Sequence, residues 1–325
     1  MKRATKLWLL AAAALVVLGM LAFICVMALN HWDYAALGSP VVNNLETKTV
    51  DIGEDFQNID LRSDTSDISF LPSKDGKCRV EFYEPKNVRS SAAVQDGTLN
   101  IEVTDKGGSW LENISLFSVG SSSITVYLPK AQYAALTIEE HTGEIALPKD
   151  FSFERIGIAA STGDVTCLAS ASGSLQIGTD TGMICLEDVS AGALALSVTT
   201  GRVEARGVDC AGAMSLDVST GKAFLTDVTC RSFSSGGSTG DITLENVVVG
   251  EKLSVERSTG DVQFERCDAG ELLVQTSTGD VSGTLRTEKV FITQSDTGKI
   301  DVPETTSGGK CKITTDTGNI KISVA

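Results

Sequence analysis

The sequence has 325 residues, a formal net charge of −15 at pH 7, 31 glycines and 6 prolines, and 42% of its residues are hydrophobic. This hydrophobic content excludes a disordered chain, and the excess of acidic residues excludes nucleic acid as a partner. Aromatic residues make up only 6% of the chain, which together with the many glycines favours short strands joined by tight turns.

The chain begins with a basic tail and a long apolar run. Lys2, Arg3 and Lys6 precede an uncharged segment at 7–29. A helix of about 20 apolar residues crosses a bilayer, and positively charged flanks stay on the cytoplasmic side. We therefore expect a single-pass cell-membrane protein with a cytoplasmic N-terminus. A signal peptide cleaved after Ala28 is the alternative, although its apolar region would exceed the usual length of about 7–15 residues.

Thr-Gly recurs ten times from residue 142 onward, at intervals of 19 or 20 residues. A period this regular predicts a stacked repeat array. The ten repeat glycines, which we expect at the corners of the coils, are Gly143, Gly163, Gly182, Gly201, Gly221, Gly240, Gly260, Gly279, Gly298 and Gly318.

Apolar residues alternate with polar ones on both sides of these glycines. Around Gly182 the apolar residues are Leu175, Ile177, Ile184 and Leu186. Period-two alternation predicts two short strands per coil, each with one face turned inward, and does not trace an α-helical face. A further apolar column predicts a third inward segment in the middle coils: Val189, Val208, Val228, Val247 and Cys267.

The pattern as a whole predicts an all-β fold, a single-chain parallel β-helix (β-solenoid) with 19–20-residue coils behind one transmembrane α-helix. The last coil, ending in "DTGNIKISVA", stays in the repeat pattern to residue 325. Unpaired strand edges invite another chain, so the sequence predicts self-association through the C-terminal coil. The expected parts are a tail at 1–6, the span at 7–29, a linker at 30–44, an irregular solenoid part at 45–135 that caps the membrane-proximal end, and regular coils at 136–325.

The Thr-Gly corner has two interpretations, a repeated turn and a repeated binding site. Glycine adopts a positive φ without strain, and the threonine before it brings a hydroxyl that can bond along a ladder. Turn chemistry alone accounts for both residues. We therefore interpret the glycines as structural corners.

Catalytic and metal-binding patterns are weak. His31 lies at the membrane edge and His141 fills a corner slot of the first regular coil. Ser238 matches GxSxG literally, but the pattern aligns with ordinary coils and no helix follows it, as a nucleophile elbow requires. The sequence thus predicts neither an enzyme nor a cofactor.

Three aspartates share one column in adjacent coils, Asp241, Asp261 and Asp280. Carboxylates at strand spacing repel one another unless a cation screens them. Lys222 precedes the three and Lys299 follows them in the repeat order, which relieves part of the repulsion. Calcium needs about six or more oxygen ligands, so a single column does not predict a calcium site.

The segment "ITVYLPKAQYAALTIEEHTGEI", followed by coils of the "STGDV" type, resembles the bacterial "putative adhesins" of domain-of-unknown-function family 4097. The resemblance covers about residues 47–325. It implies a β-strand repeat domain in the cell envelope, often behind one membrane span, and it brings no catalytic residues. The sequence departs from the family pattern where the acidic residue after glycine is replaced, at Met183, Arg202, Lys222, Lys299 and Asn319.

The sequence therefore predicts a membrane-anchored, extracytoplasmic module that binds an envelope protein or a surface ligand. Two alternatives stay open. One is a scaffold that assembles end to end. The other is a carbohydrate-active enzyme with a carboxylate-lined pocket in the loop at 104–123.

Overall fold

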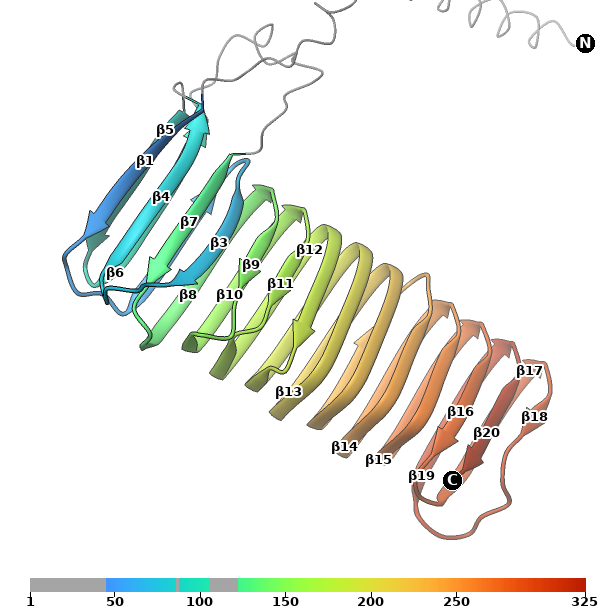
Figure 1. The fold of residues 1–325 in the computed structure, drawn as a ribbon. Helices are drawn as coiled ribbons and strands as arrows, with labels where there is room; N and C mark the ends of the chain where they lie inside the picture. The colour runs from blue at the N-terminus through green and yellow to red at the C-terminus, as the bar shows by residue number, and fades with distance from the viewer. Residues whose placement is uncertain (1–44, 86–87, 106–121) are drawn as a thin grey trace, which may run out of the picture. The chain divides into compact units, whose positions relative to one another are not determined.

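The structure, a computed structural model, describes residues 45–85, 88–105 and 122–325. Within these residues all regular secondary structure is β-strand, wound into a β-solenoid of about ten turns (Figure 1). The predicted all-β solenoid is confirmed. Among the described residues no helix has the length and apolar character to span a membrane, and the expected span at 7–29 lies outside them.

From residue 132 onward each coil lies on the one before it. Leu136 pairs with Ile156 before the repeat glycines, and Ile145 pairs with Val165 after them, both in parallel. The longest strands run through several corners without a break. The strands of these coils are β8 (Gln132–Thr142), β9 (Ile145–Leu147), β10 (Ser152–Thr162), β11 (Val165–Cys167), β12 (Ser170–Glu187), β13 (Ser190–Gly236), β14 (Ile242–Thr259) and β15 (Val262–Thr278).

The core consists of the alternating columns on the two sides of each glycine, and the third apolar column is also buried, from Val189 to Cys267. Each member of this third column follows a residue in the left-handed conformation, with φ between +51° and +63°. The chain therefore turns at a second corner in every middle coil. The residues at this corner are Asp188, Gly207, Asp227, Asn246 and Arg266.

The repeat glycines lie where neighbouring coils touch backbone to backbone. Gly260 has φ +146°, and a Cβ built on it would lie 2.1 Å from the carbonyl oxygen of Gly240. The Gly260 N–H donates a 2.8 Å hydrogen bond to the Thr278 carbonyl oxygen of the following coil. Both the positive φ and the missing space require glycine at this corner.

At the C-terminal end, the order of the coils in space differs from their order in the chain. Cys311 of β19 (Gly309–Thr317) pairs with Leu272 of β15 on one side and with Phe291 of β17 (Lys289–Thr297) on the other. The last coil is thus inserted between the two before it. On the far side of the corner, β20 (Ile320–Val324) lies between β16 (Val281–Leu285) and β18 (Ile300–Asp301) in the same way.

The expectation that the chain's last coil forms the end of the stack is therefore wrong. Both edges of that coil are hydrogen-bonded, and its inward residues Cys311, Ile313 and Ile320 are buried from both sides. The end of the stack is formed instead by β17 and β18, which we call the edge coil (Figure 1). Residues 302–308 lead back from it to β19.

The N-terminal end contains a matching insertion. The first coil consists of β2 (Asn58–Ser63) and β3 (Asp67–Pro72). On one side it pairs with β6 (Thr98–Asp105) and β7 (Ser123–Leu128), and on the other side it pairs with β8 and β9. Beyond it, three strands pair antiparallel and form a cap. They are β1 (Leu45–Ile52), β4 (Cys78–Pro85) and β5 (Val88–Gln95).

The close approach at the corners leads to a matched pair of glycine substitutions. Gly260→Ala should lower the free energy of unfolding by well over ~1 kcal/mol, because the new Cβ meets the Gly240 carbonyl and φ is unfavourable. Gly157→Ala should be neutral or stabilising, since no atom lies within 4 Å of that position and glycine inside a strand costs about 0.5–1 kcal/mol. Thermal unfolding compares the two variants. Equal melting temperatures would contradict the corner geometry.

Candidate functional site

The Thr-Gly corners form a continuous ladder along the coils. Thr259 pairs with Thr278, and Thr278 pairs with Thr317, all with exposed side chains. The glycine N–H groups bond to threonine carbonyls of the next coil, as between Gly279 and Thr317 at 2.9 Å. The repeated motif therefore connects one coil to the next through its own backbone.

The aspartates after the glycines extend this ladder. The Asp261 N–H donates to Asp241 Oδ1 at 3.1 Å, and the Asp280 N–H donates to Asp261 Oδ1 at 2.8 Å. Each carboxylate thus accepts the amide hydrogen of the coil above it. A hydrogen bond and an ion pair from Lys222 (Nζ to Asp241 Oδ2, 2.9 Å) hold the pKa of Asp241 below its usual range. The column caps backbone groups, and the described residues contain no group of three or more side chains placed to hold a metal ion.

The position of Lys299 differs from the one expected. Because the last coil is inserted, Asn319 lies next to Asp280, and its N–H donates to Asp280 Oδ1 at 2.6 Å. Lys299 comes one coil further out, where its N–H bonds to Asn319 Oδ1. The neutral amide of Asn319, not the ammonium of Lys299, therefore stands beside the aspartate column.

Of the residues considered for catalysis, the structure describes His141 and Ser238, which lie in different coils. His141 is exposed and lies 3.5 Å from an Asp64 carboxylate oxygen. The backbone N–H of Ser238 donates to the Ser219 carbonyl oxygen, in the ordinary pattern of the coils. His31 lies outside the described residues. These positions bring no nucleophile and base together.

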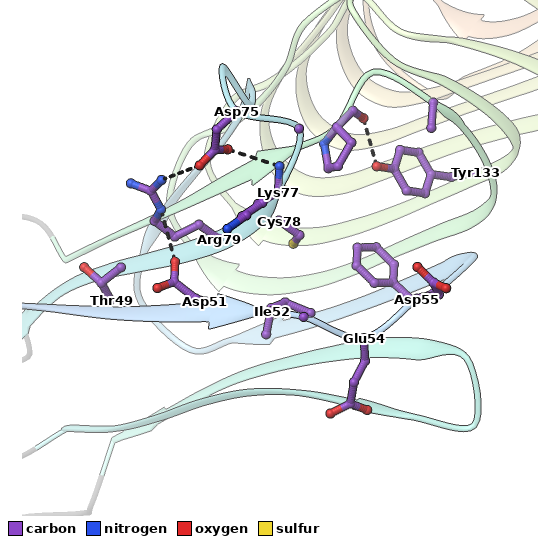
Figure 2. A pocket seen from close by; sticks show the side chains of 15 residues that line it. Thr49, Asp51, Ile52, Glu54, Asp55, Asp75, Lys77, Cys78, Arg79 and Tyr133 are labelled. Atoms are coloured by element: carbon purple, nitrogen blue, oxygen red, sulfur yellow. Dashed lines mark hydrogen bonds and ion pairs between the residues drawn. The ribbon is translucent and has the colours of Figure 1, made fainter.

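A cavity of about 730 Å³ lies between the cap and the first coils (Figure 2). On one side the Arg79 guanidinium lies between two carboxylates, 3.4 Å from Asp51 and 3.6 Å from Asp75. On the other side Phe56 stacks on Tyr133, with ring centroids 5.9 Å apart. The cavity thus has a charged wall and an aromatic wall.

Two potentially reactive groups of this cavity, the Cys78 thiol and the Tyr133 hydroxyl, are protonated at neutral pH. Burial raises the pKa of the Cys78 thiol to about 12, so the thiol stays protonated. Burial likewise raises the pKa of Tyr133 to about 12, and its hydroxyl donates to the Pro129 carbonyl. Neither the thiol nor the phenol is therefore ionised at neutral pH.

A second candidate surface is the outward face of the strands that precede the glycines in the middle coils. Two connected hollows of about 520 and 310 Å³ lie on it. Its side chains are small and uncharged, with charge only at the margin, at Asp217 and Lys252. We call it the Ser/Ala face and define it by Ser174, Gln176, Ala193, Ala195, Ser215 and Ser234.

A further inward column, three residues before each repeat glycine, was not predicted from the sequence. In one coil this position is Arg257, which is buried inside the solenoid. Its guanidinium donates to the Gly236 carbonyl at 2.6 Å and to Ser235 Oγ at 2.9 Å, and it occupies the space that Gly237 leaves open. Ser235 and Gly237, both small where other coils carry larger side chains, were the available signal.

The same column holds a buried carboxyl group at Glu140. One oxygen, Oε1, accepts from the backbone N–H groups of Ser66 and Thr142, both at 3.2 Å. The other, Oε2, is buried, and the buried hydroxyl of Ser63 on the paired strand is the side-chain hydrogen-bonding group beside the carboxyl. Burial raises the pKa of Glu140 to about 7. The contact that Glu140 makes between β8 and the inserted first coil therefore stabilises the fold most when the carboxyl is protonated.

This environment predicts a pH-dependent stability. The pKa of Glu140 in the folded protein lies above the unfolded value of 4.5. Its contribution to the free energy of unfolding is therefore complete below pH 4.5 and is lost as the pH rises through about 7. Glu140→Gln should raise the melting temperature at about pH 8 and flatten its decrease between about pH 5 and about pH 8. Thermal unfolding over this range measures both effects.

Glu139→Gln is the matched control, because Glu139 is exposed on the same strand. It should leave the slope of melting temperature against pH close to that of the wild type. An unchanged slope in Glu140→Gln would show that the buried carboxyl does not titrate in this range.

Comparison with known proteins identifies the family. A family model described as "Toastrack DUF4097" matches residues 56–222 and 211–325. A search of curated proteins found no match. Among solved structures, a "putative lipid binding protein" from Parabacteroides distasonis is similar, with 15% identity, 87% of this chain and 98% of that chain covered, and a TM-score of 0.50.

Two further structures are described as "putative adhesins". The one from Bacteroides fragilis has 16% identity, coverage of 86% and 97%, and a TM-score of 0.43. The one from Parabacteroides distasonis has 12% identity, coverage of 87% and 98%, and a TM-score of 0.47. At these identities the likeness concerns the fold alone. The family model covers most of the chain, and this protein belongs to the Toastrack DUF4097 family.

Proposed function

We propose that this protein is a membrane-anchored, extracytoplasmic binding module that acts by surface contact and not by catalysis. The apolar run at 7–29 supports the anchor, and Lys2, Arg3 and Lys6 support a cytoplasmic N-terminus. The net charge of −15 fits a soluble domain that neither nucleic acid nor anionic lipid attracts. The partner is an envelope protein or another surface ligand.

The Ser/Ala face is the observation that carries the binding role. Parallel pairing places its small side chains in rows, so a partner can approach the sheet closely along several coils. Serine hydroxyls and the Gln176 amide offer hydrogen bonds, while charges are kept at the margin. Interfaces use this division, with charged residues depleted at the centre.

The chemistry of the cap cavity supports a non-enzymatic role. Of its cationic groups, Arg79 is already paired with the carboxylates of Asp51 and Asp75, and the Cys78 thiol is held in the protonated form. A carbohydrate-active enzyme would require two convergent carboxyl groups. The loop at 104–123, where such a site was considered, lies for the most part outside the described residues, which include only 104, 105, 122 and 123 of it.

A self-assembling scaffold is the second candidate. The exposed edge coil favours it, because strand edges without partners pair readily with other strands. Binding through the Ser/Ala face and assembly through the edge coil use separate surfaces. The two roles are therefore compatible and can be tested independently.

The proposed topology predicts surface labelling of whole cells. Thr259→Cys places a thiol at an exposed corner, whereas the seven native cysteines within the described residues are buried or half-buried. A membrane-impermeant maleimide should label the variant strongly on intact cells and the wild type weakly. Labelling of the variant only after lysis would contradict the extracytoplasmic location.

The binding role predicts that charge on the Ser/Ala face abolishes capture. Tagged full-length protein in detergent, incubated with a native envelope fraction, should retain a specific partner. Ala195→Glu should reduce the retained amount at least about tenfold, because it places a charge that must be desolvated at the centre of the contact. Gln263→Glu, with the same new charge on the strand after the glycine, is the matched control and should retain the partner. Equal retention by the two variants would exclude the Ser/Ala face.

A further inference from the structure

Each strand of the edge coil has a single neighbour. β17 pairs with β19 alone, and β18 pairs with β20 alone, within the described ranges. The crossing segment at 302–308 covers only the start of this edge, where the Thr305 hydroxyl donates to the Lys289 carbonyl. From Val290 to Thr297 the outer edge of β17 is left without a strand partner in this part of the chain.

Apolar exposure is concentrated on the same coil. Five large hydrophobic side chains of the described residues are exposed, and three of them lie here, Val290, Ile292 and Ile300. Ile300 belongs to a core column whose other members are at most 1% exposed, yet it is 44% exposed itself. The hydrophobic core therefore continues into the edge coil, and no polar cap, which soluble repeat arrays ordinarily have, follows it among the described residues.

The arrangement of β17 fits a second copy of the same strand. Val290 and Ile292 are two residues apart and so share one face, with Phe291 between them on the other. In an antiparallel pair related by a two-fold axis at Phe291, Val290 lies opposite Ile292 of the second copy, and Ile292 lies opposite Val290. A two-fold interface must be complementary to itself in this way.

The opposite end of the stack does not offer an equivalent surface. The strands at the outer side of the cap are β1 and β5, and both are antiparallel to their neighbours. β1 exposes Glu46, Lys48 and Asp51, so burying it against the apolar edge coil would desolvate charges. Pairing of edge coil with edge coil is therefore favoured over head-to-tail stacking.

We propose that two copies of this protein pair end to end through their edge coils, by antiparallel addition of β17 to β17 of the second copy. In the dimer, the sheet that contains β17 continues from one copy into the other. The contact covers Ile292 and Ile300. The proposal supplies a partner for the module but requires neither the export nor the Ser/Ala face proposed above. A monomer with intact envelope binding would overturn the dimer alone, and a dimer without surface labelling would overturn the location alone.

Sedimentation of the full-length protein in detergent, from about 1 µM to about 100 µM, tests the pairing over the range in which small, weak interfaces associate. The wild type should dimerise over this range. Ile292→Lys should weaken dimerisation at least about tenfold, because lysine guards strand edges against addition. The matched control is Leu71→Lys, at an exposed leucine on β3, which is paired on both sides, and it should dimerise like the wild type.

A wild type that stays monomeric at about 100 µM would overturn the proposal. Dimers that persist in Ile292→Lys, or that are lost equally in Leu71→Lys, would also overturn it. Circular dichroism and the melting temperature establish that each variant is folded.

A disulfide experiment tests the strand register without depending on a weakened variant. Val290→Cys and Ile292→Cys are prepared as separate proteins of different tag length. A mixture under mild oxidation should give the mixed disulfide dimer, because opposed residues in an antiparallel pair have Cα atoms about 4.5–5.5 Å apart, within disulfide range. Each variant alone should cross-link much less. Equal cross-linking of all three samples, or none in the mixture, would overturn the proposed register.

Discussion

The stacking of one Thr-Gly corner on the next determines the geometry of the whole solenoid. At each corner the carbonyl oxygen of one glycine occupies the place where a side chain of the next would begin, and the amide above bonds to a threonine carbonyl. This contact sets the distance between coils and holds like positions opposite one another. The buried columns, the aspartate ladder and the rows of the Ser/Ala face all follow from this register. A coil with a side chain at its corner would displace its neighbours as well as itself.

Much of this architecture could be predicted from the sequence, because the signal is periodic. The 19–20-residue interval and the alternation around Gly182 predict two inward strands per coil, as observed. The order of the final coils could not be predicted in this way. The coils with corners at Gly298 and Gly318 place their inward residues in the same columns, so the repeat pattern does not show which of them lies on the coil with its corner at Gly279. Periodicity describes a coil and its inward face, but it does not identify the neighbour on which the coil lies.

Polar residues inside the solenoid supply part of that missing specificity. Glu140 lies opposite Ser63 of the inserted first coil, Arg257 fills the space above Gly237, and Lys289 forms a 2.6 Å ion pair with Asp268. Burial alone would raise the pKa of Asp268, yet the hydrogen bonds from Lys289 and Thr287 lower it overall. A coil shifted to another level would leave one of these groups buried without a partner, at a cost of several kcal/mol. The column that contains Glu140 and Arg257 mixes polar and apolar residues in the sequence, which is why its inward position and the role of these residues were not predicted.

The inserted last coil also constrains how the protein can be made. During synthesis residues 289–301 emerge before 309–317, yet β19 must finally separate β17 from β15. Until β19 is available, β17 can only wait unpaired or settle directly on β15, where Thr297 would occupy the place of Thr317. Repeat proteins usually lengthen by adding coils at an end. In this chain a coil added after β20 would begin from the interior of the stack, so duplication of the final repeat would not extend the solenoid outward.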